Sequence, residues 1–282
     1  MAHLTAEPQV ANCFPPVTSV QLTPGQLPRR LEALGWQHPV RLRGTLSEGP
    51  AVAIVGARAA SQLGMDRAHA LARHLASTGT HVVSGGALGI DGAAHRGALA
   101  AGPTGAGTTV VLGSGLDRPY PDRHVPLFRA VLAAGGALVS QLEDHVSPRR
   151  ATFVARNPLI SALADAVIVI EADARSGSLY TAKAALTQGR PVAAWPGSRG
   201  CDRLLAAGAA LVETIADADA LLAGTPRHAA PPALDPIARR VLAAITDGAV
   251  GVDAICASTG LGVREVLRAL PSIESSLPAR KS

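Results

Sequence analysis

Aromatic residues and cysteines are scarce in this chain of 282 residues. Aromatic residues make up only 2% of the chain, so its core has to be packed from small and aliphatic side chains. The three cysteines, Cys13, Cys201 and Cys256, are odd in number and far apart, which excludes a disulfide framework and a CxxC metal pair. A reducing compartment, the cytoplasm, is therefore the expected location.

Long apolar runs and the common nucleotide-binding signatures are also absent. No run of about 18 uncharged apolar residues occurs, and the N-terminus lacks a basic segment followed by an apolar one, so neither a membrane span nor a secretory signal is expected. The absence of GxGxxG and GxxxxGKS/T argues against a dinucleotide cofactor and P-loop hydrolysis. We predict no cofactor and no metal. The formal charge of +5 is compatible with a nucleic-acid partner but does not require one.

Residues 51–195 alternate between short apolar runs and segments with helical spacing. The runs predict strands at 51–56, 80–84, 108–113, 137–140, 166–171 and 191–195. The segments between them predict helices at 66–77, 92–101, 124–134, 157–164 and 179–188. Fully apolar strands separated by helices are typical of parallel strands buried on both faces. The predicted fold is a doubly wound α/β domain with a mostly parallel sheet.

Changes in composition divide the chain into four parts. Residues 1–50 are rich in proline and are expected to be a short lead-in that packs on the α/β domain at 51–215. An Ala/Pro-rich linker is predicted at 216–234. Residues 235–282 then predict three short helices, with Thr259-Gly260 as the turn between the second and third, a spacing that matches a helix-turn-helix.

Three glycine-rich loops follow strands and should meet at one edge of the sheet, because ligands of open α/β sheets bind where the carboxyl ends of the strands lie together. The loops start at Gly56, Ser84 and Gly113. Glycines let the backbone approach a ligand closely, and Arg58 can place two donors on a phosphate. The alternative for Arg58 is an ordinary surface arginine beside a tight turn. Together the loops predict a cleft for an anion.

Two further elements follow the same pattern. Arg156-Asn157 precedes a predicted helix with Pro158 in its first turn, so Asn157 is a candidate either for ligand binding or for capping that helix. Arg175-Ser176-Gly177-Ser178 links a strand to a helix, where the hydroxyls, the glycine and the helix dipole favour an anion.

Asp91 and His95 lie four residues apart on one face of a predicted helix. They could form an acid–base pair or ligate a metal, but no third ligand or nucleophile has a suitable spacing. We therefore expect Asp91 to cap the helix, and His95 to pair with Asp91 or to pack locally.

Taken together, these loops resemble the DNA-processing protein A (DprA/Smf) family over roughly residues 27–222. The resemblance is carried by AIVGAR (53–58), VVSGGALGIDGAAHRGAL (82–99), VLGSGLDRPYP (111–121), RNPLISALADAVIVIEADARSGSLYTAKAALTQGRPVAAWPG (156–197) and LLAAGAALV (204–212). It implies an extended Rossmann-like fold and a protein, often dimeric and not an enzyme, that binds and protects single-stranded DNA and loads the RecA recombinase in natural transformation. The last part resembles the winged-helix domain of these proteins.

Residue by residue, the family's DNA-binding motifs fall on four groups of positions. These are Gly56, Ala57 and Arg58; Ser84, Gly85 and Gly86; Arg156 and Asn157; and Ser176, Gly177 and Ser178. Arg175 is expected beside the same cleft, and Phe153 in the core. Ala57 replaces a hydroxyl residue, Pro158 replaces a basic one and the loop after Gly197 is short, so weaker DNA binding than in typical members is expected.

The alternative function is a nucleotide-binding enzyme of the phosphoribohydrolase type, which uses the glutamate of a GGxGTxxE element. The corresponding loop here, 176–182, has no acidic residue, which favours binding over catalysis. In the last part, Arg264 and Arg268 share one face of the candidate recognition helix and could contact duplex DNA or a partner protein. This part ends about 12 residues after Leu270, so a truncated wing is expected.

Overall fold

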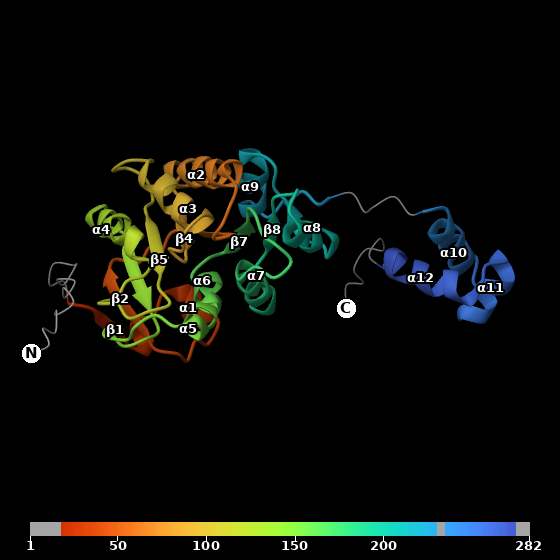
Figure 1. Ribbon diagram of the computed structural model, residues 1–282, viewed down its shortest axis with the longest axis horizontal. Helices are drawn as coiled ribbons and strands as arrows, with labels where there is room; N and C mark the ends of the chain where they lie inside the picture. The colour runs from red at the N-terminus through yellow and green to blue at the C-terminus, as the bar shows by residue number, and fades with distance from the viewer. Residues whose placement is uncertain (1–17, 230–234, 275–282) are drawn as a thin grey trace, which may run out of the picture. The chain divides into compact units, whose positions relative to one another are not determined.

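The computed structural model describes residues 18–229 and 235–274, which form two compact units. The larger unit ends at Arg227 and the smaller one begins at His228. The larger unit contains a β-sheet covered by helices, and the smaller one contains three helices (Figure 1).

A mixed β-sheet forms the centre of the larger unit. Its strands within the described residues span Val20–Leu22 (β1), Val40–Gly44 (β2), Ala51–Val55 (β3), His81–Ser84 (β4), Thr108–Val111 (β5), Ala137–Ser140 (β6), Ala166–Val169 (β7), Val192–Ala194 (β8) and Ala210–Leu211 (β9). They lie in the order β1-β2-β6-β5-β4-β3-β7-β8-β9. In this spatial order, all neighbouring strands from β6 through β3 to β9 pair in parallel. The pairs β1–β2 and β2–β6 are antiparallel. The predicted mostly parallel α/β fold is confirmed.

Helices cover both faces of this sheet (Figure 1). Within the described part of the larger unit they span Arg29–Ala33 (α1), Gln62–Ser77 (α2), Ile90–Leu99 (α3), Val125–Ala133 (α4), Arg150–Ala155 (α5), Asn157–Ala162 (α6), Ser178–Thr187 (α7), Arg199–Ala206 (α8) and Ile215–Leu222 (α9), with 3-10 turns at Pro24–Gln26 and Asp122–His124. Side chains alternate along a strand, so Val52 and Ile54 of β3 pack under α2 and α3 while Ala53 and Val55 pack under α6 and α7. Both faces of β3 are therefore buried, as its apolar sequence predicts.

The order of the strands reverses beside β3. The strands β4, β5 and β6 follow on one side of it, whereas β7, β8 and β9 lie on the other. The loops that follow β3 and β7 consequently leave the sheet side by side. In open α/β sheets a ligand-binding crevice forms at the carboxyl ends of the strands at such a switch point.

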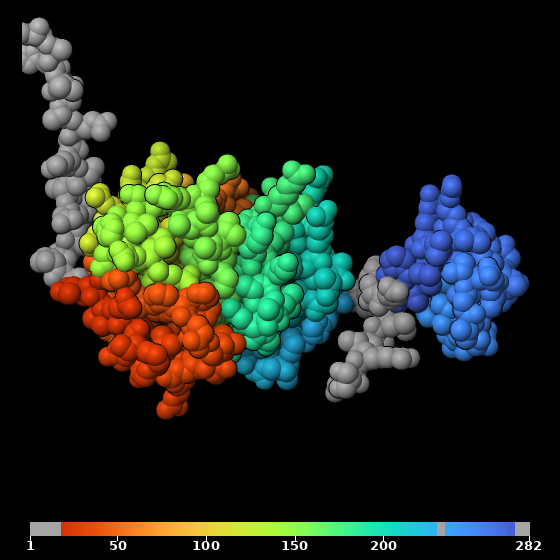
Figure 2. All heavy atoms as spheres, turned by 90° about the horizontal axis from the view of Figure 1, so that it is seen from below, coloured from red at the N-terminus to blue at the C-terminus, as the bar shows by residue number. Residues whose placement is uncertain are grey.

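Residues 18–50, expected only to pack on the α/β domain, are part of its sheet. β1 pairs with β2, β2 pairs with β6, and Leu31 of α1 is fully buried. The Arg30 side chain forms an ion pair with Asp165 at 2.7 Å. In Figure 2 this segment, in red and orange, forms a continuous surface with the yellow-green and green middle of the chain. The β2–β6 pairing and the Arg30–Asp165 ion pair join segments about 100 residues or more apart, so a local sequence pattern does not reveal them.

The linker expected from residue 216 begins later in the structure. Residues 215–222 form α9, which starts where the Thr214 hydroxyl accepts a hydrogen bond from the amide of Asp217 at 3.2 Å. Ala218 and Leu221 of this helix are buried against the sheet. Alanine has the highest helix propensity, so the Ala-rich composition that suggested a linker is equally compatible with a packed helix.

The smaller unit consists of Pro236–Thr246 (α10), Val252–Thr259 (α11) and Val263–Glu274 (α12). Gly260 ends α11 with φ of +67°, a backbone conformation that favours glycine, and this confirms the predicted turn between the second and third helices. After Leu270 the helix α12 continues to Glu274, and the rest of the predicted truncated wing falls on residues 275–282, outside those described. Across residues 18–229 and 235–274, no helix combines the length and hydropathy needed to cross a membrane.

His95 is fully buried in α3 and does not pair with Asp91, so of its two expected roles the structure shows local packing. Its Nδ1 lies 2.8 Å from the hydroxyl of Thr108. Because that hydroxyl already donates to the carbonyl oxygen of Val82, it accepts the ring N–H of His95. The other ring nitrogen, Nε2, has no hydrogen-bond partner among the described residues. Burial therefore lowers the pKa of His95 from 6.5 to about 3.

This lowered pKa predicts a loss of stability in acid. The unfolded chain binds a proton at His95 near pH 6.5 and the folded chain only near pH 3, so stability falls as the pH drops between these values. From pH 7.5 to pH 5, His95 should remove about 2 kcal/mol. In urea unfolding, His95→Gln should be less stable than the wild type at pH 7.5 and lose about 2 kcal/mol less on acidification. Equal losses in both proteins would assign the pH dependence to other groups.

Candidate functional site

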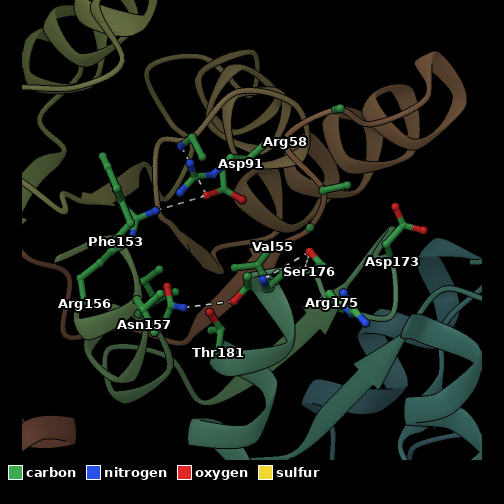
Figure 3. Close-up of a pocket in the computed structure, with 18 of the residues that line it drawn as sticks. Val55, Arg58, Asp91, Phe153, Arg156, Asn157, Asp173, Arg175, Ser176 and Thr181 are labelled. Carbon is green, nitrogen blue, oxygen red and sulfur yellow. Dashed lines mark hydrogen bonds and ion pairs between the residues drawn. The ribbon is translucent and has the colours of Figure 1, made fainter. Parts of the chain in front are cut away.

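A cleft of about 550 Å³ opens at the switch point, between the loops that follow β3 and β7 (Figure 3). Its walls are residues 56–59, residues 173–178 with the first turn of α7, and the helices α5 and α6. The candidate residues from the sequence that line it are Gly56, Ala57, Arg58, Arg156, Asn157, Arg175, Ser176, Gly177 and Ser178. The structure thus brings three of the four motif groups together.

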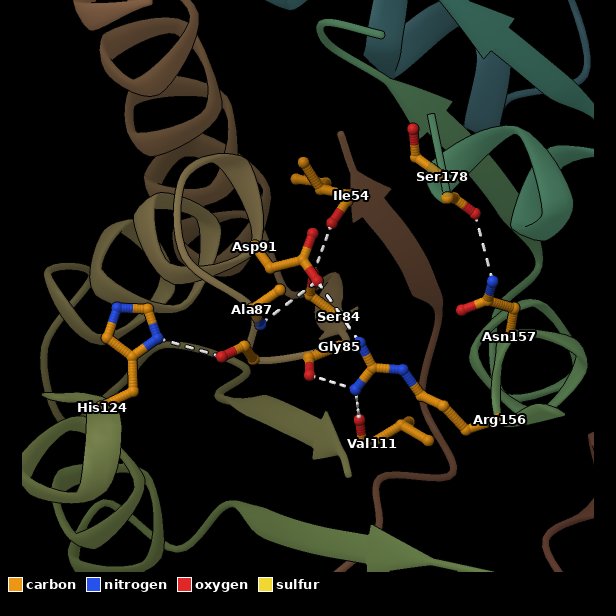
Figure 4. A network of polar contacts seen from close by, with 12 residues as sticks. Ile54, Ser84, Gly85, Ala87, Asp91, Val111, His124, Arg156, Asn157 and Ser178 are labelled. Carbon is orange, nitrogen blue, oxygen red and sulfur yellow. Dashed lines mark hydrogen bonds and ion pairs between the residues drawn. The ribbon is translucent and has the colours of Figure 1, made fainter. Parts of the chain in front are cut away.

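Arg156 is a buried clamp, not a free phosphate ligand. Only 6% of the residue is exposed. Its Nη1 donates to the carbonyl oxygens of Gly85 and Val111, which lie just beyond β4 and at the end of β5, and its Nη2 lies 3.9 Å from a carboxylate oxygen of Asp91 (Figure 4). Burial lowers the pKa of Arg156 to about 10, which leaves the side chain protonated at neutral pH. In this structure the side chain is bound to protein groups, and its direct contact with DNA stays a prediction.

The glycine-rich loops were predicted to bind an anionic ligand, and in the structure the carboxylate of Asp91 binds backbone amides of these loops instead. Its carboxylate accepts hydrogen bonds from the backbone amides of Gly56 and Ala87. The next amide, that of Ala57, donates to the carbonyl oxygen of Glu171 at 2.7 Å. Burial raises the pKa of Asp91, while Arg156 and the two amides oppose that shift. The amides of residues 56 and 57 are therefore already in use inside the protein.

The expected capping role of Asp91 is also wrong. The residue that precedes α3 is Gly89, and no side chain caps this end of the helix. Asp91 instead lies inside the first turn and reaches across to the loop after β3. Gly56 makes this approach possible, because a Cβ there would lie 2.5 Å from the side chain of Ile90 and 2.9 Å from the carbonyl oxygen of Glu171.

Residues 84–86, the remaining motif group, do not line the main cleft. Ser84 is fully buried and its hydroxyl donates to the carbonyl oxygen of Ile54 at 2.6 Å. Gly86 has φ of +69°, and a Cβ there would press against Val110 and Phe128. Gly85 borders a small hollow of about 50 Å³ beside Tyr120. In this conformation the loop supports the cleft wall and offers no side-chain donor to a ligand.

Asn157 joins the two sides of the cleft. Its side-chain amide donates to the carbonyl oxygen of Gly177 at 3.1 Å, so it ties α6 to the loop that leads into α7. It does not cap α6, because it is the first residue of that helix and no side chain caps this end. In the same loop the hydroxyls of Ser176 and Ser178 lie 2.8 Å apart, and Arg175 is exposed.

Phe153 of α5 was expected in the core but is half-buried and lines the cleft. The guanidinium carbon of Arg58 lies 4.9 Å from the centre of its ring, and the centres of the Tyr120 and Phe153 rings are 5.5 Å apart. Sequence reasoning missed α5, since six residues are too few to show a helical period. A usable signal was present, because an aromatic residue among Arg149, Arg150 and Arg156 is typical of surfaces that bind nucleic acids.

The exposed charge of the cleft is mainly positive. Arg58, Arg150 and Arg175 are exposed at its rim, and none of them forms an ion pair within the described part of the chain. Asp173 is the exposed acidic residue among those that line it. No group of three or more His, Cys, Asp or Glu side chains in the described ranges could hold a metal ion. The cleft is suited to a polyanion.

Arg264 and Arg268 lie on α12, the candidate recognition helix, and both are exposed. Val263 and Leu267, which precede them, are each 52% exposed. Residues 235–282 contain six basic and five acidic residues, a net charge of +1, so this unit lacks the large positive excess that usually accompanies binding to a duplex.

Comparison with known proteins identifies the family. The family described as DNA recombination-mediator protein A matches residues 25–223, and the DprA winged helix domain matches residues 225–274. The chain therefore belongs to the DNA recombination-mediator protein A (DprA/Smf) family, with a Rossmann-like domain followed by a winged helix domain. This confirms the resemblance and the fold inferred from the sequence.

Two relatives named DNA processing protein DprA show the extent of the match. The protein of Mycobacterium tuberculosis is 41% identical over 268 residues, covering 89% of this chain and 66% of the relative, so the chain spans about two thirds of its length. The protein of Streptococcus pneumoniae is 39% identical over 169 residues, covering 58% of each chain.

Solved structures of the same family have the same fold. A structure of DNA processing protein A from Helicobacter pylori, described by its single-stranded DNA binding mode, superposes with a TM-score of 0.66 at 29% identity, covering 75% of this chain and 99% of that one. The DprA structure from Streptococcus pneumoniae gives a TM-score of 0.64 at 34% identity, covering 73% and 75%.

The clamp formed by Arg156 makes a prediction about stability. Arg156→Met should lower the free energy of unfolding by about 3–5 kcal/mol, because it leaves the buried Asp91 carboxylate without its cation. The double variant with Asp91→Asn should recover part of this loss, which a double-mutant cycle in urea measures. As a control, Arg175→Ala removes an exposed cleft arginine and should change stability by less than about 0.5 kcal/mol. A loss below about 1 kcal/mol in Arg156→Met would contradict the clamp.

Proposed function

We propose that this chain binds single-stranded DNA in the cleft at the switch point. The observation that carries the proposal is the set of three exposed arginines, Arg58, Arg150 and Arg175, that line one cleft together with the half-buried ring of Phe153. Arginine binds phosphate through paired, charge-assisted hydrogen bonds, and an aromatic ring stacks on any base. The Helicobacter pylori relative described by its single-stranded DNA binding mode supports the same ligand.

In this proposal the arginine side chains, not the backbone amides, hold the phosphates. The amides of residues 56 and 57 already donate within the protein, and Ala57 has no hydroxyl to offer. Binding through guanidinium groups and one stacked ring carries little base preference. The phosphoribohydrolase alternative gains no support from the cleft, because the loop at 176–182 brings serine hydroxyls to it and no carboxylate.

We further propose that the bound strand is protected and passed to the RecA recombinase, and that the chain acts as a homodimer in the cytoplasm on DNA taken up in natural transformation. Membership of a family described as recombination mediators supports this step. A mediator of this kind has to hold a strand without covering its bases completely, and a cleft that grips mainly phosphates satisfies that requirement.

The first prediction of this function concerns salt. If three to five phosphates are neutralised, log affinity for a dT oligonucleotide should fall with a slope of about −2 to −3.5 against log salt. Arg58→Ala should weaken binding at 100 mM salt and reduce the slope by about 0.7, since one phosphate contact is lost. Fluorescence anisotropy at several salt concentrations measures both quantities.

Phe153→Leu is the matched uncharged variant in the same titrations. It should weaken binding by about 1–3 kcal/mol through lost stacking and leave the salt slope unchanged. If Arg58→Ala binds with the same affinity as the wild type, Arg58 does not contact a phosphate. If Phe153→Leu changes the salt slope, the stacking contact of Phe153 and the phosphate contact of Arg58 are not independent.

The second prediction concerns RecA. On single-stranded DNA coated with a single-strand-binding protein, the wild-type chain should shorten the lag before RecA hydrolyses ATP, because it clears a site for filament nucleation. Arg58→Ala should leave the lag unchanged, and on uncoated DNA both proteins should behave alike. No effect of the wild type on the lag would contradict RecA loading, and a monomer in sedimentation equilibrium would contradict the homodimer.

A further inference from the structure

A groove of about 340 Å³ lies beside the cleft, along the seam between α6 and α7. Val154 and Asn157 line both the cleft and this groove, so the two hollows adjoin. The other wall comes from one face of α7, where Tyr180, Lys183 and Thr187 follow one another at intervals of three and four residues. A polymer held in the cleft can therefore pass directly into the groove.

Two hydrogen bonds hold the walls of the groove together. At one end the side-chain amide of Asn157 donates to the carbonyl oxygen of Gly177 at 3.1 Å (Figure 3). At the other end the side-chain amide of Gln188 donates to the carbonyl oxygen of Pro158 at 2.9 Å. Gly177 and Gln188 directly precede and follow α7, so this helix is tied to α6 at both of its ends. The groove is therefore formed before a ligand binds, which lowers the free-energy cost of binding.

The side chains of the groove combine apolar surface with a single cation. Tyr180 and Val154 are 56% and 44% exposed, and Pro158 adds to the apolar wall. Lys183 is exposed and forms no ion pair within the described part of the chain. None of the described residues that line the groove is acidic. An exposed aromatic ring near an unpaired cation suits a chain of bases and phosphates, because the ring stacks on a base and the ammonium group attracts a phosphate.

We propose that the groove holds the continuation of the single strand beyond the cleft, with a base on the ring of Tyr180 and a phosphate on the ammonium group of Lys183. This inference rests on the proposed function and extends its binding site. The face from Tyr180 to Thr187 spans about 10 Å at about 1.5 Å per residue, and a stacked strand rises about 3.4 Å per nucleotide. The groove therefore adds up to about three nucleotides to those in the cleft.

The scarcity of lysine makes contact with Lys183 directly measurable. The chain has two lysines, Lys183 and Lys281. A dT 20-mer that contains an abasic site carries an aldehyde there, which forms a Schiff base with a nearby lysine amine and is trapped by borohydride. Peptide mass mapping should find the adduct on Lys183. The Lys183→Arg variant keeps the positive charge, so it should bind the 20-mer with wild-type affinity and form no adduct at position 183.

Two variants test the groove by affinity, with a dT 20-mer compared against a dT 5-mer that the cleft alone can hold. Lys183→Gln should reduce the salt slope of the 20-mer by about 0.7, since one phosphate contact is lost. Tyr180→Leu should weaken binding of the 20-mer by at least about 5-fold through lost stacking and leave its salt slope unchanged. Neither variant should change the affinity for the 5-mer.

Two matched controls remove similar groups outside the groove. Leu186→Ala removes a side chain of the same helix that is 59% exposed and does not line the groove. Arg73→Gln removes an exposed cation of α2. Both should bind the 5-mer and the 20-mer as the wild type does.

The outcomes separate this inference from the function on which it rests. A 20-mer that binds the wild type without an adduct at Lys183 would overturn the groove site and leave the cleft intact. If Tyr180→Leu binds the 20-mer normally but no longer shortens the RecA lag, the groove receives a protein, and its role for the strand is overturned. Failure of both oligonucleotides to bind the wild type would overturn the proposed function, and the groove site with it.

Discussion

The buried pair of Arg156 and Asp91 is the interaction on which the site depends. Arg156 enters from the junction of α5 and α6 and holds the carbonyl oxygens of Gly85 and Val111, while Asp91 holds the amides of Gly56 and Ala87. Charges this deep persist only when they are paired and hydrogen-bonded, so the pair forces the loops after β3, β4 and β5 and the end of α5 into one arrangement. The cleft is the space that this arrangement leaves open.

The pair also determines which groups remain for a ligand. Because Asp91 and Glu171 occupy the amides of residues 56 and 57, the positive potential of the cleft comes from arginines that extend from its rim. One arginine is buried and shapes the site, whereas Arg58, Arg150 and Arg175 are exposed at the rim, where the proposed function has them contact phosphates. Long, flexible cations at the rim suit a strand whose sequence is not read.

Sequence reasoning predicted six of the seven parallel strands to within about two residues, because each is a short apolar run between turn signals. It missed β1, β2 and the parallel strand β9, and the helices α8 and α9. It also missed α5, and with it Phe153 and Arg150, because one and a half turns of helix show no period. The candidate residues at 56–58, 156–157 and 175–178 do meet at one cleft, whereas those at 84–86 support it from behind.

The sequence by itself determined the fold class, the family and the edge of the sheet where the site lies, because apolar periodicity and glycine-rich loops after strands are local properties. Only the tertiary structure decided the role of each residue. Arg58 and Arg156 are both arginines within recognised motifs, yet one is exposed over the ring of Phe153 and the other is buried against Asp91. A side chain's role depends on the partners and the burial that distant segments supply, and neither is encoded in its neighbours along the chain.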